Sequence, residues 1–395
     1  MKPSYDYIIV GAGIAGMKAV EAIRRYDGDG SILLINGEDR LPYKRTRISK
    51  NIHGGFERNA FAITTASWFE TMQIDYLSGR AKTIALKTQI LLDENKEKYR
   101  WRKLILCNGT LPVLPILKGN GKQDIMVLRT ASDAEMIISK AQKAEKILVS
   151  GGGVLGIEIA AEMVLAGKNV SLVHRDAYLM NKHFDSELSK RLHHLLQEHG
   201  IQVILQEKID AVSRTGNDKI LVEVGGLIHM LTDMVIFSVG VMPDISIAKQ
   251  SGLSTNRGIK VNEFLETSYP NIYAAGDVAE HPDGNVTGLW HAAENQGTIA
   301  GSNASGEKIK YQNKPYRLKL EVFDQYYFSM NVPEFFVNRD ELIHENHNKY
   351  YHFFFEGGKL SGLLMANDKP MAKTCETAVK QNWTKELVVK TFIDI

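Results

Sequence analysis

Two glycine-rich segments have the residue types and spacing most directly suited to chemistry. The first reads Gly11-Ala12-Gly13-Ile14-Ala15-Gly16, and the second reads Gly151-Gly152-Gly153-Val154-Leu155-Gly156. In this spacing the first glycine permits a tight turn, the second lets the backbone approach a pyrophosphate, and the third lets a helix pack closely on a strand. The amides at the start of the helix then attract phosphate. A single copy also fits an ordinary turn between strand and helix, but two copies in one chain predict two bound dinucleotides.

Apolar patterning places each turn between a strand and a helix, which is the context that the motif requires. Short apolar runs precede both turns, stretches typical of helices follow them, and a second strand comes after each helix. In order, these segments are 7–10, 14–26 and 31–35 in the first half, and 147–149, 154–166 and 169–173 in the second. The sequence therefore predicts two βαβ units and an α/β fold.

Two acidic residues follow predicted strands. Glu38 lies about 20 residues beyond Gly16, at the position where a carboxylate accepts the hydroxyl groups of a ribose. A solvated loop acid is the alternative interpretation. Much later, the short strand predicted at 273–277 delivers Asp277 at its C-terminal end.

The rest of the chain is expected to form shorter elements. We predict a helix over 68–76, hairpin strands over 80–101, a helix over 289–304, and a small α+β region past residue 317. A one-sided leucine stripe predicts a further helix over 185–199. The histidines of that stretch are expected on or beside its solvated face, and we expect no metal site; they are His193, His194 and His199.

The overall composition is that of an ordinary globular protein. A chain of 395 residues is long enough for two or three domains. It carries 48 basic and 46 acidic residues, a net charge of +2, so it has no general bias toward nucleic acid. No apolar run approaches the roughly 20 residues of a membrane span. The alanine-rich N-terminal stretch superficially resembles a signal peptide, but the first glycine turn explains it better, and we expect a cytoplasmic protein.

Two cysteines, Cys107 and Cys375, lie far apart and form no C-x-x-C motif. Cys107 ends an apolar run, and Cys375 stands at helical spacing with Met371 and Val379, so both are predicted to be buried core thiols. The sequence therefore disfavours chemistry through a redox-active disulfide.

The segment from 40 to 58 is strongly basic. It contains six basic residues against Glu57 alone, a net charge of +5; these are Arg40, Lys44, Arg45, Arg47, Lys50 and Arg58. Such a cluster is commonly a solvated face. Behind a phosphate-binding turn it could also neutralise a cofactor or attract an acidic partner.

Together these features resemble the FAD-dependent pyridine nucleotide-disulfide oxidoreductase superfamily. Within it, the chain is similar to the NAD(P)H-dependent rubredoxin and ferredoxin reductases and the flavoprotein portion of NADH nitrite reductases, which work without a redox-active disulfide. Residues 41–50, Leu-Pro-Tyr-Lys-Arg-Thr-Arg-Ile-Ser-Lys, resemble that branch's Pro-Tyr-x-Arg and Leu-Ser-Lys signature, with isoleucine in place of leucine. Residues 273–278, Tyr-Ala-Ala-Gly-Asp-Val, resemble the second FAD motif of the superfamily.

The resemblance implies two interleaved Rossmann-like domains, one for FAD and one for NAD(P)H, and a small C-terminal α+β domain. The FAD domain would comprise 1–118 and 245–316, and the NAD(P)H domain 119–244. Residues 317–395 would form an interface domain that serves contacts between subunits of a homodimer or with a partner. Segments 106–109 and 238–244 resemble the two crossover strands between the domains.

The resemblance also implies roles for individual residues. FAD would be contacted by Gly11, Gly13, Ala15, Gly16, Glu38, Arg45, Lys50, Gly109, Gly276, Asp277 and Trp290. The NAD(P)H co-substrate would be contacted by Gly151, Gly153, Gly156, His174, Arg175 and Gly240. Lys50 and Glu158 would form an ion pair and act in catalysis, because a lysine beside the ring stabilises negative charge there and the carboxylate offsets the burial of the cation.

Each of these roles has a plainer alternative. Lys50 could be an ordinary surface lysine, and Glu158 a helix N-terminal acid favoured by the dipole. Trp290 could be a core tryptophan.

The preferred coenzyme stays open. The position for a ribose-binding acid in the second unit holds His174, followed by Arg175 and Asp176. An arginine without a carboxylate suits a 2′-phosphate. The resembling branch mostly uses NADH, however, and Asp176 could replace the missing acid.

These features lead to one principal functional hypothesis and two alternatives. The first is an electron-transfer flavoenzyme that passes electrons from NAD(P)H through FAD to a small acidic redox protein of rubredoxin or ferredoxin type. The second is the flavoprotein component of a larger reductase, such as a nitrite reductase. The third is a non-catalytic module that senses flavin and NAD(P)H. We expect neither nucleic acid nor a membrane as a partner.

Overall fold

The chain folds into two compact units, each assembled from separate stretches of sequence. The structure is a computed structural model that describes residues 3–216, 219–333 and 340–393. Unit 1 comprises Met1–Arg47, Phe56–Leu111 and Val241–Asn313. Unit 2 comprises Ile48–Gly55, Pro112–Gly240 and Lys314–Ile395.

Unit 1 contains a mixed sheet built around the first glycine turn. Its strand order is β3-β2-β1-β6-β5-β4, with β18 also paired to β6. The pairs among β3, β2, β1, β6 and β18 are parallel, whereas β4, β5 and β6 form the antiparallel meander predicted over 80–101. The strands are β1 Ser4–Val10, β2 Ile32–Asn36, β3 Ile74–Ser78, β4 Ala81–Ala85, β5 Ile90–Asp93, β6 Lys98–Leu106 and β18 Ile272–Ala274.

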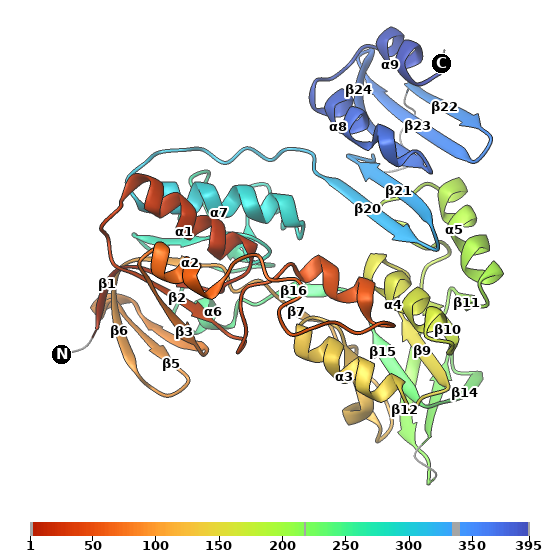
Figure 1. The fold of residues 1–395 in the computed structure, drawn as a ribbon, viewed down its shortest axis with the longest axis horizontal. Helices are drawn as coiled ribbons and strands as arrows, with labels where there is room; N and C mark the ends of the chain where they lie inside the picture. The colour runs from red at the N-terminus through yellow and green to blue at the C-terminus, as the bar shows by residue number, and fades with distance from the viewer. Residues whose placement is uncertain (1–2, 217–218, 334–339, 394–395) are drawn as a thin grey trace. The chain divides into compact units, whose positions relative to one another are not determined.

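Two helices of unit 1 pack very closely. Helices α1 (Ile14–Tyr26) and α7 (Trp290–Ala304) lie side by side in Figure 1. A Cβ at Gly297 would come 2.1 Å from the carbonyl oxygen of Ala15, and a Cβ at Gly301 would come 2.4 Å from that of Ala19. Only glycine therefore allows this approach, which brings α7 directly against the first turns of α1.

The remaining elements of unit 1 are short. They are α2 Ala66–Thr71, the 3₁₀ turn η2 Leu86–Thr88, α6 Ser246–Gln250, and the paired strands β17 Ile259–Lys260 and β19 Ala279–Glu280. Strands β7 (Thr110–Pro112) and β16 (Val241–Pro243) pair where the chain passes between units. The 3₁₀ turn η1, Arg45–Asn51, spans the change from unit 1 to unit 2 in the sequence.

Unit 2 contains a parallel sheet built around the second glycine turn. Its strand order is β11-β10-β9-β15-β8, next to a separate antiparallel sheet of β12, β13 and β14. The strands are β8 Ile125–Val127, β9 Lys146–Ser150, β10 Asn169–His174, β11 Gln202–Leu205, β12 Ile209–Arg214, β13 Ile220–Val224, β14 Ile228–Thr232 and β15 Met234–Phe237. The helical elements are η3 Lys122–Asp124, α3 Ala131–Ala141, α4 Val154–Leu165 and α5 Ser186–Glu198.

The C-terminal part of unit 2 is a five-stranded antiparallel sheet in the order β20-β21-β24-β23-β22. Its strands are β20 Arg317–Val322, β21 Gln325–Met330, β22 Asp340–Asn346, β23 Lys349–Glu356 and β24 Lys359–Ala366. The short turn η4 Lys369–Met371 and helices α8 Ala372–Lys380 and α9 Lys385–Phe392 follow. Tyr351, Phe353 and Phe355 point to the same core as Cys375 and Phe392, so both helices cover one face of this sheet.

The opposite face of that sheet is also buried, because it contacts the start of α5. Asp185, the N-cap of α5, accepts hydrogen bonds from the Leu188 amide at 2.7 Å and the Tyr350 hydroxyl at 2.6 Å. It also lies 2.7 Å from Nδ1 of the buried His352. These contacts explain why residues 314–395 belong to the same unit as the second βαβ region.

The predicted fold class is confirmed: two sheets with a parallel βαβ core each carry a glycine turn, and an antiparallel sheet with helices ends the chain. The helix predicted over 68–76 is wrong in its second half, where the chain forms β3. Gln73 adopts a left-handed conformation with φ 49°, and the following residues pair in parallel with β2. Tertiary pairing here overrides the local helical pattern.

Candidate functional site

The first glycine turn has the geometry of a phosphate cradle. Gly11 has φ +107°, and a Cβ there would come 2.3 Å from the carbonyl oxygen of Cys107. A Cβ on Gly16 would come 1.9 Å from the carbonyl oxygen of Gly11, so the start of α1 sits directly on the turn. Gly13 faces open space, with nothing within 4 Å of a Cβ. No side chain of the described residues caps α1 at Gly13, so this helix end suits an external anion.

The second turn repeats this geometry at the three glycines that it shares with the first, Gly151, Gly153 and Gly156. Gly151 has φ +119°, and its Cβ would come 2.1 Å from the carbonyl oxygen of Ser238. The Cβ of Gly156 would come 1.9 Å from the carbonyl oxygen of Gly151, and Gly153 again faces open space. Within the described residues, no side chain caps α4 at Gly153 either. The two turns therefore fit two pyrophosphates. The residues present are thus compatible with two dinucleotides, such as FAD and a nicotinamide coenzyme.

Glu38 lies in a small hydrogen-bonded cluster after β2. Oε1 accepts a hydrogen bond from Arg45, and the Tyr43 hydroxyl donates to Oε2 at 2.9 Å. Arg45 also donates to the Tyr43 hydroxyl at 3.0 Å. The Glu38 side chain is only 12% exposed, so the solvated-loop alternative does not describe it. A carboxylate has four lone-pair sites, so Glu38 keeps acceptor capacity for a ribose.

Other residues expected at the FAD site gather at the ends of the unit 1 strands. Gly276 follows β18 with φ +80°, and its amide donates to Oε1 of the buried Gln296 at 2.7 Å. A Cβ on Gly276 would lie 3.0 Å from the Cβ of Ala15, so the β18 turn abuts the first glycine turn. Asp277 comes next and is partly exposed.

Gly109 and Trp290 complete the residues expected at this site. Gly109, beyond β6, has φ +73° and accepts a hydrogen bond from the Asp244 amide at 2.9 Å. Trp290 is partly exposed at the start of α7, 6.0 Å below the Lys44 ammonium, so it is no core tryptophan.

Lys50 and Glu158 form the ion pair that the resemblance implies. The Lys50 ammonium lies 3.1 Å from Oε1 of Glu158, and the Ser49 hydroxyl donates to Oε2 at 2.5 Å. Glu158 is 6% exposed, in the buried stretch of α4 rather than in its first turn, so the dipole-cap alternative is wrong. Burial raises the pKa of Glu158, and the nearby Lys50 charge opposes that rise.

A second pair lies one helical turn further along α4, and sequence reasoning missed it. Oε2 of Glu162 accepts from the His53 amide at 3.1 Å and lies 2.7 Å from His53 Nδ1. Glu162 is 9% exposed. The sequence signal was present: two glutamates four residues apart in an otherwise apolar helix share one face and need partners there.

Strand β20 adds charges around Lys50 that the sequence did not reveal. Lys369 forms an ion pair with Glu321 at 2.6 Å, and it lowers the pKa of that carboxyl with help from the Lys50 charge. Burial lowers the pKa of Lys319, and the Lys50 charge lowers it further.

His174, at the end of β10, is tied into the second turn. The Gly152 amide donates to its Nδ1 at 3.1 Å, and its Nε2 lies 3.1 Å from the Tyr178 carbonyl oxygen. This pattern requires a neutral ring with its proton on Nε2. Burial lowers the pKa of His174, which favours that form. Both ring nitrogens are therefore occupied, and neither serves as an acceptor for a ribose.

The residues after His174 are more accessible. The Arg175 side chain is 74% exposed, and its Nε lies 3.7 Å from Asp176. Gly240, the last residue expected at the coenzyme site, has φ +116° and accepts a hydrogen bond from the Val113 amide at 3.0 Å.

Both cysteines are buried and reduced, as predicted. Burial raises the pKa of Cys107 to about 12 and also raises that of Cys375. Neither thiol is therefore ionised near neutral pH, where a reactive cysteine must be a thiolate.

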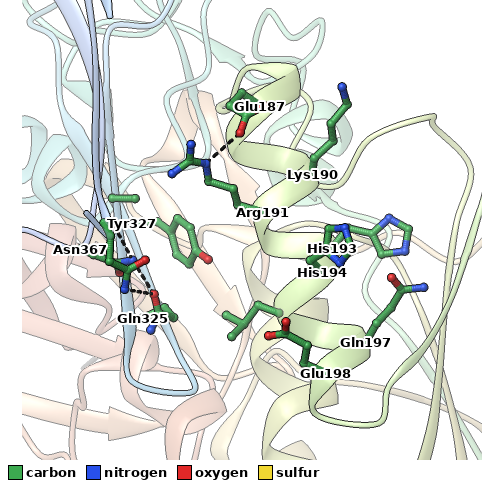
Figure 2. A pocket seen from close by; sticks show the side chains of 13 residues that line it. Glu187, Lys190, Arg191, His193, His194, Gln197, Glu198, Gln325, Tyr327 and Asn367 are labelled. Carbon is green, nitrogen blue, oxygen red and sulfur yellow. Dashed lines mark hydrogen bonds and ion pairs between the residues drawn. The ribbon is translucent and has the colours of Figure 1, made fainter. Parts of the chain in front are cut away.

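A polar groove of about 720 Å³ lies between α5 and strands β21 and β24 (Figure 2). His193 and His194 line it from the helix, opposite Gln325 and Tyr327 from the sheet. Arg191 donates to Glu187 at 2.9 Å along the same helix. Across the described parts of the chain, no group of three or more His, Cys, Asp or Glu side chains is arranged to hold a metal ion. Over the same residues, no helix has the length and apolar character needed to cross a bilayer.

Comparisons with known proteins agree with this geometry. Residues 5–297 match the pyridine nucleotide-disulphide oxidoreductase family. The chain is 31% identical over 309 residues to the NADH-rubredoxin oxidoreductase of Clostridium acetobutylicum, covering 78% of this chain and 76% of that protein. The crystal structure of the ferredoxin reductase for the CYP199A2 system from Rhodopseudomonas palustris superposes with a TM-score of 0.85 at 25% identity, covering 92% of this chain and 91% of that one.

Another relative is much longer than this chain. The assimilatory nitrate reductase electron transfer subunit of Bacillus subtilis is 27% identical over 368 residues, which is 91% of this chain but only 47% of that protein. The chain thus spans about half the length of this curated relative. Because the family match covers most of the sequence and both glycine turns, the chain belongs to the pyridine nucleotide-disulphide oxidoreductase family.

Proposed function

We propose that this chain is an FAD-dependent NAD(P)H oxidoreductase that passes electrons from a nicotinamide coenzyme through FAD to a small one-electron carrier of rubredoxin type. The observation that supports this most directly is the repetition of one phosphate-cradle geometry at Gly11–Gly16 and Gly151–Gly156. Two such cradles in one chain serve a bound dinucleotide cofactor and a dinucleotide co-substrate. The buried, protonated cysteines leave the flavin as the redox centre.

The first turn, Glu38, Arg45 and Asp277 would hold FAD. When bound, FAD accepts two electrons as a hydride and releases them one at a time. The chain's own contribution is position and charge. Lys50 would set a positive charge beside the ring, and the Glu158 carboxylate offsets the cost of burying that charge. Ser49 fixes the second oxygen of Glu158, so the carboxylate has one orientation.

The coenzyme choice falls to Arg175 and Asp176. Because both nitrogens of His174 are occupied within the second unit, the ribose meets the two residues that follow it. The exposed Arg175 suits a 2′-phosphate, whereas Asp176 suits a free diol. We propose that NADPH is accepted at least as well as NADH.

The carrier is proposed to be a small acidic protein. Of the basic residues in 40–58, Arg45, Lys50 and Arg58 pair with Glu38, Glu158 and Asp39. The exposed Lys44 and Arg47 are the side chains of this segment that we propose for contact with a partner. Attraction through so few charges predicts a moderate salt dependence of the acceptor's second-order rate constant.

Stopped-flow reduction tests the proposal. NADH and NADPH, run in parallel, should bleach the absorbance of bound FAD, and rubredoxin or a ferredoxin added afterwards should restore it. Purified protein that neither contains nor takes up FAD would overturn the proposal. So would a reduced protein that no small iron–sulfur carrier reoxidises.

A second candidate function is that of an electron-transfer component in a larger reductase. It is favoured by the relative from Bacillus subtilis, which is about twice as long and is named as an electron transfer subunit. On this hypothesis the terminal metal centre lies outside these 395 residues. Rapid reduction by NAD(P)H, slow turnover with free carriers, and co-purification with a metal-containing reductase would favour it over the first candidate.

A further inference from the structure

Helix α4 buries two carboxylates on one face. Glu158 and Glu162 are 6% and 9% exposed, and every residue from Gly156 to Met163 is buried. They are four residues apart, so they lie on the same side of the helix, one turn from each other. Two buried negative charges so placed repel each other, and Glu162 contributes to the raised pKa of Glu158. Each carboxylate therefore requires its own donor.

Both donors come from one short segment, Ile48–Gly55. This segment packs with unit 2, although the residues on both sides of it in the sequence belong to unit 1. Lys50 pairs with Glu158 at 3.1 Å, and His53 pairs with Glu162 at 2.7 Å. Lys50 and His53, three residues apart in the segment, thus each reach one of the two glutamates that lie four residues apart on α4. The two pairs form a clamp with two contacts, which we define as Lys50–Glu158 and His53–Glu162.

The two contacts differ in stiffness. A lysine ammonium sits at the end of four rotatable bonds, so its single contact fixes its position poorly. His53 gives Glu162 two donors to one oxygen, the backbone amide at 3.1 Å and Nδ1 at 2.7 Å. The contact at His53 therefore fixes the backbone itself, three residues from Lys50.

Lys50 also has competing charges nearby. The Lys50 charge lowers the pKa of both Glu321 and Lys319 on β20. A segment that could shift along α4 would change the distance between the ammonium and Glu158. Holding the segment at His53 removes that freedom.

We propose that His53 and Glu162 are positioning residues that hold Lys50 in place against Glu158 and thereby set the rate of hydride transfer to the flavin. The link to the flavin rests on the proposed function, whereas the clamp itself does not. His53 touches neither reactant in this proposal; it acts through the backbone of the segment and through Lys50.

The test compares two replacements of one residue. His53→Asn places an amide nitrogen close to the position of Nδ1 and keeps a donor for Glu162, whereas His53→Leu has similar bulk and no donor. In flavin-free protein, His53→Leu should speed hydrogen exchange of the backbone amides of 48–55, and His53→Asn should leave it near the wild-type rate. In flavin-loaded protein, His53→Leu should slow reduction by NAD(P)H roughly tenfold, the size expected for a small misplacement of a charged group. His53→Asn should restore most of that rate.

A Lys50→Met background separates positioning from general structure. If His53 acts through Lys50, then His53→Leu should slow flavin reduction no further once the lysine is gone. An additional tenfold loss in that background, or unchanged exchange of 48–55 in His53→Leu, would overturn the proposal.

Failure of the clamp is distinguishable from failure of the proposed function. If NAD(P)H does not reduce the flavin of the wild-type protein, the proposed function and the rate link both fail. The exchange measurement then still decides whether the clamp exists.

Discussion

The two βαβ units of this protein share one geometry in their glycine turns, but they have different residues where the second strand ends. Of the three glycines that the two turns share, the first lies against a carbonyl oxygen, the second faces open space, and the third contacts the first. After β2 stands Glu38, an acceptor that holds Arg45 and Tyr43. Strand β10 ends at His174, a neutral ring that accepts from the Gly152 amide within the second turn.

This difference separates two tasks that one motif performs. Glycine spacing fixes the backbone geometry that receives a pyrophosphate, because only glycine tolerates these φ values and contacts. The residue at or just beyond the end of the second strand is the one that we propose for recognition beyond the phosphates. We propose that Glu38 is the acceptor for a ribose in the first unit. In the second, His174 accepts from the Gly152 amide, and we propose that recognition is left to Arg175 and Asp176.

The largest effect is expected from matched changes of the third glycine. Gly16→Ala adds a methyl group 1.9 Å from the Gly11 carbonyl oxygen, which forces α1 off the turn, at a cost of about 1–3 kcal/mol in folding free energy and most of the bound FAD. Gly156→Ala makes the same clash in the second unit and should abolish reduction by NAD(P)H while the protein stays yellow. Flavin absorbance per protein and stopped-flow reduction measure both. Equal loss of FAD in the two variants would contradict the assignment of the turns.

A smaller effect is expected in how the unfolding free energy depends on pH, and it comes from the second βαβ unit alone. Because burial lowers the pKa of His174 below 6.5, the native state keeps the ring neutral, and its contribution to stability is complete above pH 6.5. That contribution is lost as pH falls from 6.5 through the lowered pKa, since the unfolded chain then binds a proton that the native ring excludes. A folded-state pKa that is lower by one pH unit corresponds to about 1.4 kcal/mol of unfolding free energy.

His174→Asn is the control, because it offers a hydrogen-bonding group near Nδ1 without titrating. The difference in unfolding free energy between wild type and this variant should shrink or change sign as pH falls below 6.5. Taking the difference cancels the contribution of the buried His352, which is the same in both proteins. Burial lowers the pKa of His352, but its hydrogen bonds to Asp185 and Glu341 outweigh burial and raise it, so its contribution to the pH dependence has the opposite sign. A constant difference between pH 5 and 8, the range in which histidine titrates, would contradict the neutral-ring assignment.

The smallest effect on electron transfer is expected from the cysteines. Cys107→Ser and Cys375→Ser should each keep flavin reduction and carrier reduction within about twofold, because neither thiol ionises near neutral pH. Each should lower the unfolding free energy by about 1–3 kcal/mol, since a hydroxyl replaces a thiol in the core. Loss of electron transfer in a folded, flavin-loaded variant would contradict a flavin-only path.

Sequence reasoning predicted the local elements well where one pattern dominated. The helices over 14–26 and 289–304 and the helix begun by Asp185 all formed within one residue of expectation. It failed at 68–76, where pairing with β2 made a strand of residues with a helical pattern. It missed His53 and Glu162 as partners, because donors on one segment and acids on a distant helix meet only after folding.

The sequence by itself determined the two cradles, since glycine at fixed spacing permits the positive φ of the turn and the close contact between the first and last glycine of each motif. It also determined that the cysteines would be buried thiols, through the apolar runs that contain them. The resemblance already implied that Lys50 meets Glu158. Tertiary structure alone decided that His53 meets Glu162 and that Asp185 meets His352. The physical reason is that a buried charge is stable only beside a partner, and partners more than 100 residues away in the chain come together through the packing of whole helices and sheets.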